Sequence, residues 1–437
     1  MGIFSMLPRP GGGGGGNQIV TFDNGAIISG GKRYTYTNSI IAGTKNQGRD
    51  ALMQHLIGNA LNAQDAVFVI QNGSALSNNT LRNSFFHGWG GRQFFSLDLA
   101  QKSATTPINF LKNSSIDFVH ELIVLLFKSF KGNASDDLCG FVERYFNEIL
   151  QLYKRAPQKK LTLANLGDFD YHWMETEAYR LEAAGLMSTQ ERDRVLRYTS
   201  NLPMYQKELL DYENFCIELS KFSFAQLLSG SVSYNQLNSN QYITFITLDP
   251  VSKPKQSKAF LHMFIHKALS MIGKSGIHTT FVFEDINLFE IDEFPELLRS
   301  CNSSGGDKCI FTLDSVVSRP NDTVDFRTLC NCYFVMRQST ANEAEEWSKT
   351  IGSHKVLKET MSTAPYTQIY GRENRGLLGG IVNFLNRNRE VYSGKQTQEV
   401  EEYVVLPEEF IKLSGTECMV IVNSHGGYPY YQRVVIC

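Results

Sequence analysis

The alternation of apolar and polar residues divides this chain into three parts of different character. Residues 18–104 contain short apolar runs of strand type, among them SIIAG (39–43) and AVFVI (66–70), and one helix-period stretch at 50–63. Residues 105–230 carry apolar stripes at helical spacing with almost no strand pattern, which predicts about five helices. From 231 to 437 the two patterns alternate again. The sequence therefore predicts an α/β fold, a mostly parallel sheet with helices on both faces, interrupted by an all-α inserted domain.

The last part of the chain has strands and helices at the spacing of β-α units. Strand patterns occur at 242–248, 278–285, 309–315, 332–338 and 418–423, the last of which is predicted to be the final strand. Helix patterns occur at 258–272, 293–301 and 341–352. In the middle part, Ser188 followed by Glu191 is a capping box that predicts the start of a helix. Six glycines at 11–16 predict that residues 1–17 form a flexible tail.

Composition and charge are those of an ordinary globular protein. Hydrophobic residues make up 42% and charged residues 20% of the chain, and the formal net charge is -2, so the whole chain carries no nucleic-acid footprint. The most apolar stretch, 118–130, includes charged residues and is too short to cross a bilayer. We therefore expect a cytoplasmic protein without direct membrane insertion, which would reach a membrane only through its partners.

The eight cysteines form no recognisable framework, because no CxxC pair occurs. Reduced and mostly buried thiols are the simplest interpretation. A zinc site built from Cys301, Cys309, Cys330 and Cys332 is the alternative, but their spacing matches no standard module, so no metal site is predicted.

The segment GTKNQGRD (43–50) is similar to the phosphate-loop pattern G-x-x-x-x-G-K-[ST]. Gly43 and Gly48 match its glycines, whereas Arg49 and Asp50 stand in place of the lysine and the hydroxyl residue. A guanidinium is broader than an ammonium, and a carboxylate would lie beside the phosphates. Lys45 is the other candidate for the phosphate cation, and helix N-capping is the alternative role for Asp50. The strand before the loop and the helix and strand after it form the β-α-β context that a phosphate loop requires.

A second candidate feature is the pair of acids that ends the run FVFED. Nucleotide hydrolysis on a parallel sheet uses acids at a strand end to hold magnesium and orient water. Here Glu284 precedes Asp285, the reverse of the usual order in phosphate-loop ATPases. The alternative is a pair of solvated acids at the end of a strand.

The order of these parts resembles the coupling proteins of type IV secretion and conjugation (the TraG/TraD group). That group consists of hexameric RecA-like motor ATPases with an all-α domain inserted after the phosphate-loop half. The similar stretches, which together span roughly residues 30 to 437, are IIAGTKNQGRD with AVFVIQNG, the re-entry segment ending in AFLHMFIHKAL, FVFEDINLFEIDEFPELLRSC, LCNCYFVMRQSTANEAEEWSKTIG, and YVVLPEEFIKLSGTECMVIVN.

The resemblance carries over residue by residue. Gly43 and Gly48 correspond to the loop glycines, Arg49 and Asp50 to the altered cation and magnesium positions, and Glu284 and Asp285 to the acid pair. In addition, Asp314 stands where the family has a strand-ending glutamine, Arg299 is the only arginine near the expected arginine position, and the family's N-terminal transmembrane helices are not expected here. The phosphate cation, the magnesium ligand, the order of the acids, the glutamine and the arginine are all altered, as relaxed demand for hydrolysis would produce.

The predicted function is that of a coupling-protein-like pseudo-ATPase. It would be a non-catalytic scaffold or substrate-recruiting subunit, with no cofactor or with weakly bound ATP and magnesium. The resemblance implies apparatus proteins as partners, among them an active ATPase paralogue, together with a protein or DNA substrate and a ring oligomer. The alternative is an active ATP-dependent DNA or protein translocation motor that uses Lys45 or Arg49. A third interpretation is an unrelated protein that shares only the phosphate-loop architecture.

Overall fold

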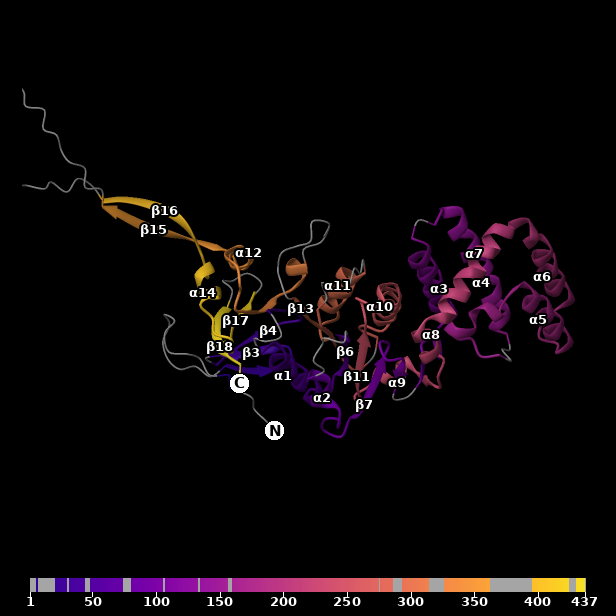
Figure 1. Cartoon of the computed structure of the whole chain (residues 1–437), viewed down its shortest axis with the longest axis horizontal. Helices are drawn as coiled ribbons and strands as arrows, with labels where there is room; N and C mark the ends of the chain where they lie inside the picture. Colours follow the sequence, from indigo (N-terminus) through magenta and orange to yellow (C-terminus); the bar gives the residue numbers. More distant parts are fainter. Residues whose placement is uncertain are drawn as a thin grey trace, which may run out of the picture.

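The computed structural model describes most of the chain. The described ranges are 5–6, 20–29, 31–43, 48–73, 80–104, 107–132, 134–155, 159–274, 276–285, 293–313, 326–361, 395–423 and 430–436. Lys45, Asp314 and the glycines at 11–16 lie outside these ranges. The molecule is elongated, with a sheet at its centre, a group of helices at one end and a long hairpin at the other (Figure 1).

The centre is a ten-stranded sheet with the order β18-β17-β14-β5-β13-β12-β6-β11-β7-β8. In chain order its strands are β5 (Asn38–Ala42), β6 (Ala66–Asn72), β7 (Gln93–Asp98), β8 (Ser103–Ala104), β11 (Tyr242–Leu248), β12 (Thr279–Phe283), β13 (Lys308–Leu313), β14 (Cys332–Met336), β17 (Glu417–Val422) and β18 (Tyr430–Val435). The seven strands from β14 to β7 run parallel, and only β8, β17 and β18 pair antiparallel. The predicted mostly parallel sheet is confirmed.

Both faces of the sheet are covered, because successive strand residues point to opposite sides. On one side, Ile41 packs in a core with α1 (Arg49–Asn62), α2 (Thr80–Phe85) and a small antiparallel sheet. On the other side, Ile40 belongs to a core with α10 (Pro254–Leu269), α11 (Phe294–Ser304), α12 (Ala341–Ile351) and α14 (Pro407–Ile411). The small sheet consists of β1 (Ser5–Met6), β2 (Val20–Asp23), β3 (Ala26–Ser29) and β4 (Lys32–Thr35). Strands buried on both faces explain the continuous apolar runs in the sequence.

The helices at the end of the molecule come from the middle of the chain. They are α3 (Ile116–Lys131), α4 (Asp136–Tyr153), α5 (Tyr171–Ala183), α6 (Thr189–Asn201), α7 (Gln206–Lys221) and α8 (Ser223–Leu227), with the 3₁₀ turns η2 (Leu163–Asp168) and η3 (Leu202–Tyr205). Four of the helices begin at a side chain that accepts a backbone N–H: Ser115, Ser135, Asp170 and Ser188. The capping box of Ser188 and Glu191 is formed as predicted.

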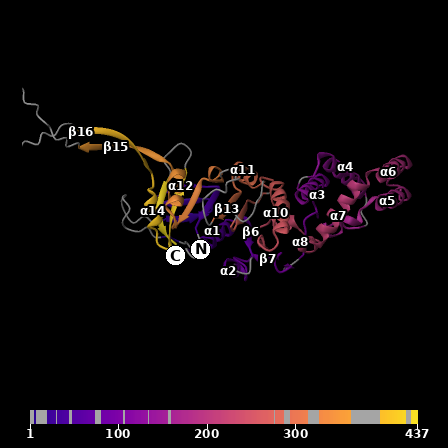
Figure 2. The same cartoon turned by 45° about the horizontal axis from the view of Figure 1, so that its top comes forward.

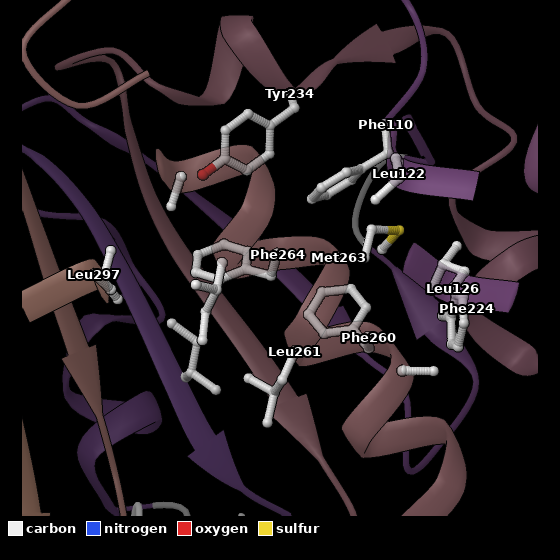
Figure 3. Close-up of a cluster of buried hydrophobic side chains, with 14 of the residues drawn as sticks. Phe110, Leu122, Leu126, Phe224, Tyr234, Phe260, Leu261, Met263, Phe264 and Leu297 are labelled. Carbon is white, nitrogen blue, oxygen red and sulfur yellow. The ribbon is translucent and has the colours of Figure 1, made fainter. Parts of the chain in front are cut away.

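The end helices join the sheet through short elements and shared core. The strands β9 (Ile108–Asn109) and β10 (Val232–Ser233) pair with each other, and α9 (Tyr234–Leu237) follows. Phe260, Met263 and Phe264 of α10 lie beside Leu122 of α3 and Phe110 (Figure 3). Figure 2 shows the helices extending beyond α10, away from the hairpin.

Several elements differ from the prediction or were missed by it. The strand at 418–423 is not the last one, because β18 follows and pairs with β17 along six residues. Its sequence, YYQRVV, alternates polar and apolar residues at a sheet edge and gives a weaker signal than a buried strand. The hairpin of β15 (Ser353–Met361) and β16 (Lys395–Tyr403) was not predicted, since its sequence is rich in charged residues. The strand β7 was also missed.

Cysteines and membrane segments can be stated for the described residues only. The seven cysteines in the described ranges are buried and free, as predicted for reduced thiols. Within the same ranges, no group of three or more metal-binding side chains occurs. None of the helices that the structure describes combines the length and apolar character needed to span a bilayer.

Candidate nucleotide-type site

The two loop glycines lie at the carboxyl end of β5, where a phosphate loop would be. The backbone N–H of Gly43 donates to the carbonyl of Leu313 at 2.9 Å, which ties the start of the loop to β13. Gly48 is the N-cap of α1 and has φ 82°, a left-handed conformation that glycine adopts without strain. The N-terminus of a helix favours anions through its free N–H groups and its dipole. The described residues therefore place a strand end and a helix N-terminus on the two sides of the loop, as a phosphate site requires.

Arg49 turns away from solvent and toward the acids of β12. Its side chain is 0% exposed, and Nη1 lies 2.8 Å from Oδ1 of Asp285. Its Nη2 lies 3.7 Å from Oε1 of Glu284, and Nη1 donates to the carbonyl of Gly43 at 3.2 Å. The structure thus joins the altered loop to the acid pair. The predicted phosphate-cation residue therefore pairs with the two acids predicted for magnesium.

The acids are held firmly at the end of β12. Both are buried, with Glu284 4% and Asp285 5% exposed, so the alternative of a solvated pair is wrong. The backbone N–H of Glu284 donates to the carbonyl of Ile70 at 2.8 Å. Asp285 has φ 54°, an uncommon conformation for a residue other than glycine, although aspartate tolerates it better than most. Its N–H donates to Oγ1 of Thr312 at 2.7 Å, which fixes this strained backbone.

Thr312 is a residue that sequence reasoning missed. It comes from β13, the strand between β5 and β12, and its hydroxyl also donates to Oδ1 of Asp285 at 3.4 Å. A signal existed, since Thr312 is the polar residue near the end of the apolar run CIFTL. Without knowledge of the strand order, however, nothing linked it to Asp285.

The charge of the site opposes a bound polyphosphate. With Arg49 as +1 and Glu284, Asp285 and Asp50 as -1 each, the formal charges of these side chains sum to -2. Asp50 lies in the first turn of α1 and is half-buried. It offers no hydroxyl as a magnesium ligand. The described residues therefore provide the strand end and the helix start that flank a phosphate loop, but not the free cation and hydroxyl that hold ATP and magnesium in working motors.

The remaining predicted positions do not join this site. Arg299 lies on the exposed side of α11 and pairs with Glu296, with 3.4 Å between Nη1 and Oε2. Lys45 and Asp314 are outside the described residues. The roles assigned to the individual site residues stay predictions.

The fold and the loop together define the class of this protein. A mostly parallel sheet is covered on both faces, and Gly43 and Gly48 lie in the connection from β5 to α1. An acid pair follows β12, which is separated from β5 by the single strand β13. This is a RecA-like α/β fold of the phosphate-loop type.

Comparison with solved structures specifies which RecA-like proteins share this fold. The bacterial conjugative coupling protein TrwBdeltaN70, in its unbound monoclinic form, matches with a TM-score of 0.55 and 13% identity over 98% of this chain and 96% of that chain. The plasmid coupling protein TrwB in complex with ADP and Mg²⁺ matches with a TM-score of 0.55 and 14% identity over 97% and 95%. VirB4 of Thermoanaerobacter pseudethanolicus matches with a TM-score of 0.52 and 9% identity over 92% and 89%.

These likenesses confirm the predicted resemblance as a likeness of fold along nearly the whole chain. No protein-family model matches the sequence. No curated protein matches it significantly either. At 9–14% identity, these solved structures share the fold of this chain and few of its residues.

Proposed function

We propose that this protein is a non-catalytic, coupling-protein-like subunit of a type IV secretion or conjugation apparatus. The sheet would act as a scaffold that retains the motor fold without its chemistry. Residues 105–230, proposed as an all-α domain between the two RecA-like parts at 18–104 and 231–437, would offer a surface for substrates or partner subunits. An active ATPase paralogue and a ring assembly are part of the proposal.

One observation supports this proposal above the others: Arg49 is buried between Gly43, Glu284 and Asp285. An incoming phosphate would have to compete with an aspartate only 2.8 Å from the guanidinium. A charge-assisted hydrogen bond inside a protein is stronger than one in water, so this exchange is unfavourable. Asp50 adds repulsion at the same helix end.

The test is titration with a fluorescent ATP analogue, with and without magnesium. We expect weak binding that magnesium does not strengthen, and no turnover. The double variant Arg49→Lys with Asp50→Thr places the lysine and the hydroxyl of the phosphate-loop pattern at these two positions. We expect its magnesium-dependent affinity for the ATP analogue to rise at least ~10-fold, equivalent to about 1.4 kcal/mol. Glu296→Gln, an exposed acid on α11, is the matched control and should change nothing.

The second candidate is an active motor with a divergent loop. The observation that favours it is the strained backbone of Asp285, because such strain is commonly kept where an acid has a role. Tight magnesium-dependent binding by the unaltered protein, with turnover abolished in Glu284→Gln but not in Glu296→Gln, would establish the motor and refute the scaffold.

A further inference from the structure

The end helices are attached to the sheet through a compact joint. We call α3–α8 the helical lobe and the rest of the described chain the sheet lobe. Within the sheet lobe, the part that contacts the helical lobe is called the joint, and it consists of residues 107–115 and 228–237 together with α10. The N–H of Gly230 donates to the carbonyl of Ile108 at 2.9 Å, so the entering and leaving segments run side by side. Nζ of Lys112 donates to the carbonyl of Ser231 at 2.6 Å, which ties the same segments at the surface. The two connections are therefore held together by hydrogen bonds.

Lys267 of α10 is buried at the centre of this joint. It is only 4% exposed, and its Nζ donates to Oγ of Ser114 at 2.8 Å, in the segment that enters the helical lobe. Nζ lies 4.4 Å from the centre of the ring of Phe118 in α3 and 5.9 Å from that of Tyr234 in α9. One side chain thus contacts the entering segment, the first helix of the helical lobe and the element that follows the leaving segment.

The charge of Lys267 has no counter-charge nearby. The acids that face α10 are bound to its histidines: Oε2 of Glu293 lies 2.6 Å from Nδ1 of His262, and Oε2 of Glu121 lies 3.6 Å from Nε2 of His266. Among the described residues, no carboxylate lies within ion-pair distance of Nζ, and Ser114 supplies its one hydrogen-bond acceptor. Burial lowers the pKa of Lys267 to about 8. Burial also lowers the pKa of His266, whose ring stacks on the ring of Phe118 with 5.0 Å between the ring centres.

The joint is therefore subject to two opposing forces. Phe110, Phe260 and Phe264 form one continuous apolar core between the lobes (Figure 3), and this core favours a fixed packing. A buried ammonium in the same place disfavours it, because a cation loses more hydration than two ring faces and one hydroxyl return.

We propose that the uncompensated charge of Lys267 loosens the joint while the lysine is protonated, so that the helical lobe reorients against the sheet lobe more readily at neutral than at alkaline pH. The proposal rests on the packing of the joint and is independent of the nucleotide-type site.

The direction follows from proton linkage. The packed joint binds the proton of Lys267 less tightly than an open joint, in which the side chain is hydrated and has its ordinary pKa of 10.5. Raising the pH from about 8 toward 10.5 therefore favours the packed joint. Below about pH 8 the packed joint carries the full penalty of the buried charge.

The test is the distance between the lobes, measured by electron–electron double resonance. Spin labels would be placed at two exposed positions, through Arg197→Cys on α6 and Lys412→Cys after α14. We expect the unaltered joint to give a broad distance distribution at pH 7 that narrows as the pH rises from about 8 toward 10.5. Lys267→Met removes the charge at similar length and should give the narrow distribution at both pH values. Lys267→Arg keeps the charge and should stay broad at both.

The matched control is Lys112→Met, an exposed lysine of the same joint. It should not narrow the distribution at pH 7, and it should retain the pH response. If Lys267→Met does not fold, two further measurements test the proposal. One is the pH titration of the unaltered joint. The other is Ser114→Ala, which removes the one hydrogen-bond acceptor of the charged lysine and should leave the distance distribution at pH 7 at least as broad as that of the unaltered joint. Two results would overturn the proposal. One is a distance distribution of the unaltered protein that does not change with pH, and the other is a distribution for Lys267→Met that is as broad at pH 7 as that of the unaltered protein.

Discussion

At the scale of single residues, Arg49 differs in shape from the lysine of the phosphate-loop pattern, although both side chains carry one positive charge. A lysine ammonium is a compact charge, whereas a guanidinium presents a planar fork that matches carboxylates. In the structure that fork faces Asp285 and Glu284. The side chain at the predicted phosphate-cation position is thus part of the buried framework between β5, α1 and β12.

The first prediction concerns this ion pair. Arg49→Met should lower the free energy of unfolding by about 3–5 kcal/mol, because it leaves two buried acids without their cation. Chemical denaturation at neutral pH measures the change. Arg299→Met is the control, since its pair with Glu296 is exposed and should contribute about 0–1 kcal/mol. Equal effects of the two substitutions would show that the Arg49 pair is not structural.

At the scale of elements, the helical lobe depends on well-defined helix starts. The helix α6 begins at Ser188, whose hydroxyl accepts the N–H of Glu191, while the carboxylate of Glu191 accepts the N–H of Ser188. Arg155, beyond the end of α4, donates to the same carboxylate at 2.6 Å. One acid therefore caps its own helix and connects it to another.

This arrangement predicts a specific dependence on pH. The hydrogen bonds from Arg155 and from the backbone and hydroxyl of Ser188 lower the pKa of Glu191 to about 2. A lowered carboxyl pKa stabilises the folded state above the unfolded value of 4.5, and this contribution disappears as the pH falls toward 2. Thermal unfolding should therefore show Glu191→Gln as less stable than the unaltered protein at pH 6, with the difference vanishing near pH 2. Glu296→Gln should show a smaller difference, and a gap for Glu191→Gln that is constant with pH would contradict the assignment.

At the scale of the whole molecule, the cores of the two lobes are continuous, yet the chain passes between the lobes only at the joint. Gly230 permits the close approach of the two connecting segments. A Cβ at Gly230 would lie 1.8 Å from the carbonyl oxygen of Pro107, a backbone atom that cannot move without displacing the entering segment. The close approach of the entering and leaving segments thus requires a residue without a side chain at position 230.

The corresponding prediction compares two glycines. Gly230→Ala should destabilise the protein by more than about 2 kcal/mol, because the backbone must shift to relieve the overlap. Gly140→Ala lies inside α4 with nothing within 4 Å of the added carbon, and it should stabilise the protein by about 0.5–1 kcal/mol. Denaturant unfolding curves of both variants provide the measurement. A neutral Gly230→Ala would show that the joint tolerates separation of its segments.

The candidate site could be predicted in its parts but not in its connections. Gly43, Gly48, Arg49 and Asp50 stood out because a phosphate loop has fixed local spacing, and Glu284 and Asp285 stood out as acids after an apolar run. Thr312 and the strained backbone of Asp285 could not be found in this way, since they depend on β13 lying between β5 and β12.

Local pattern by itself determined the α/β class, the buried strands, the helices of the middle segment and the altered loop, because periodicity and glycine spacing are properties of neighbouring residues. Only the tertiary structure decided that Arg49 pairs with the acids and that Lys267 lies uncompensated in the joint. It also revealed the edge strand β18 and the hairpin of β15 and β16. The reason is physical: burial and counter-charges arise from residues far apart in the chain, so they exist only once the strands have been ordered and the lobes packed.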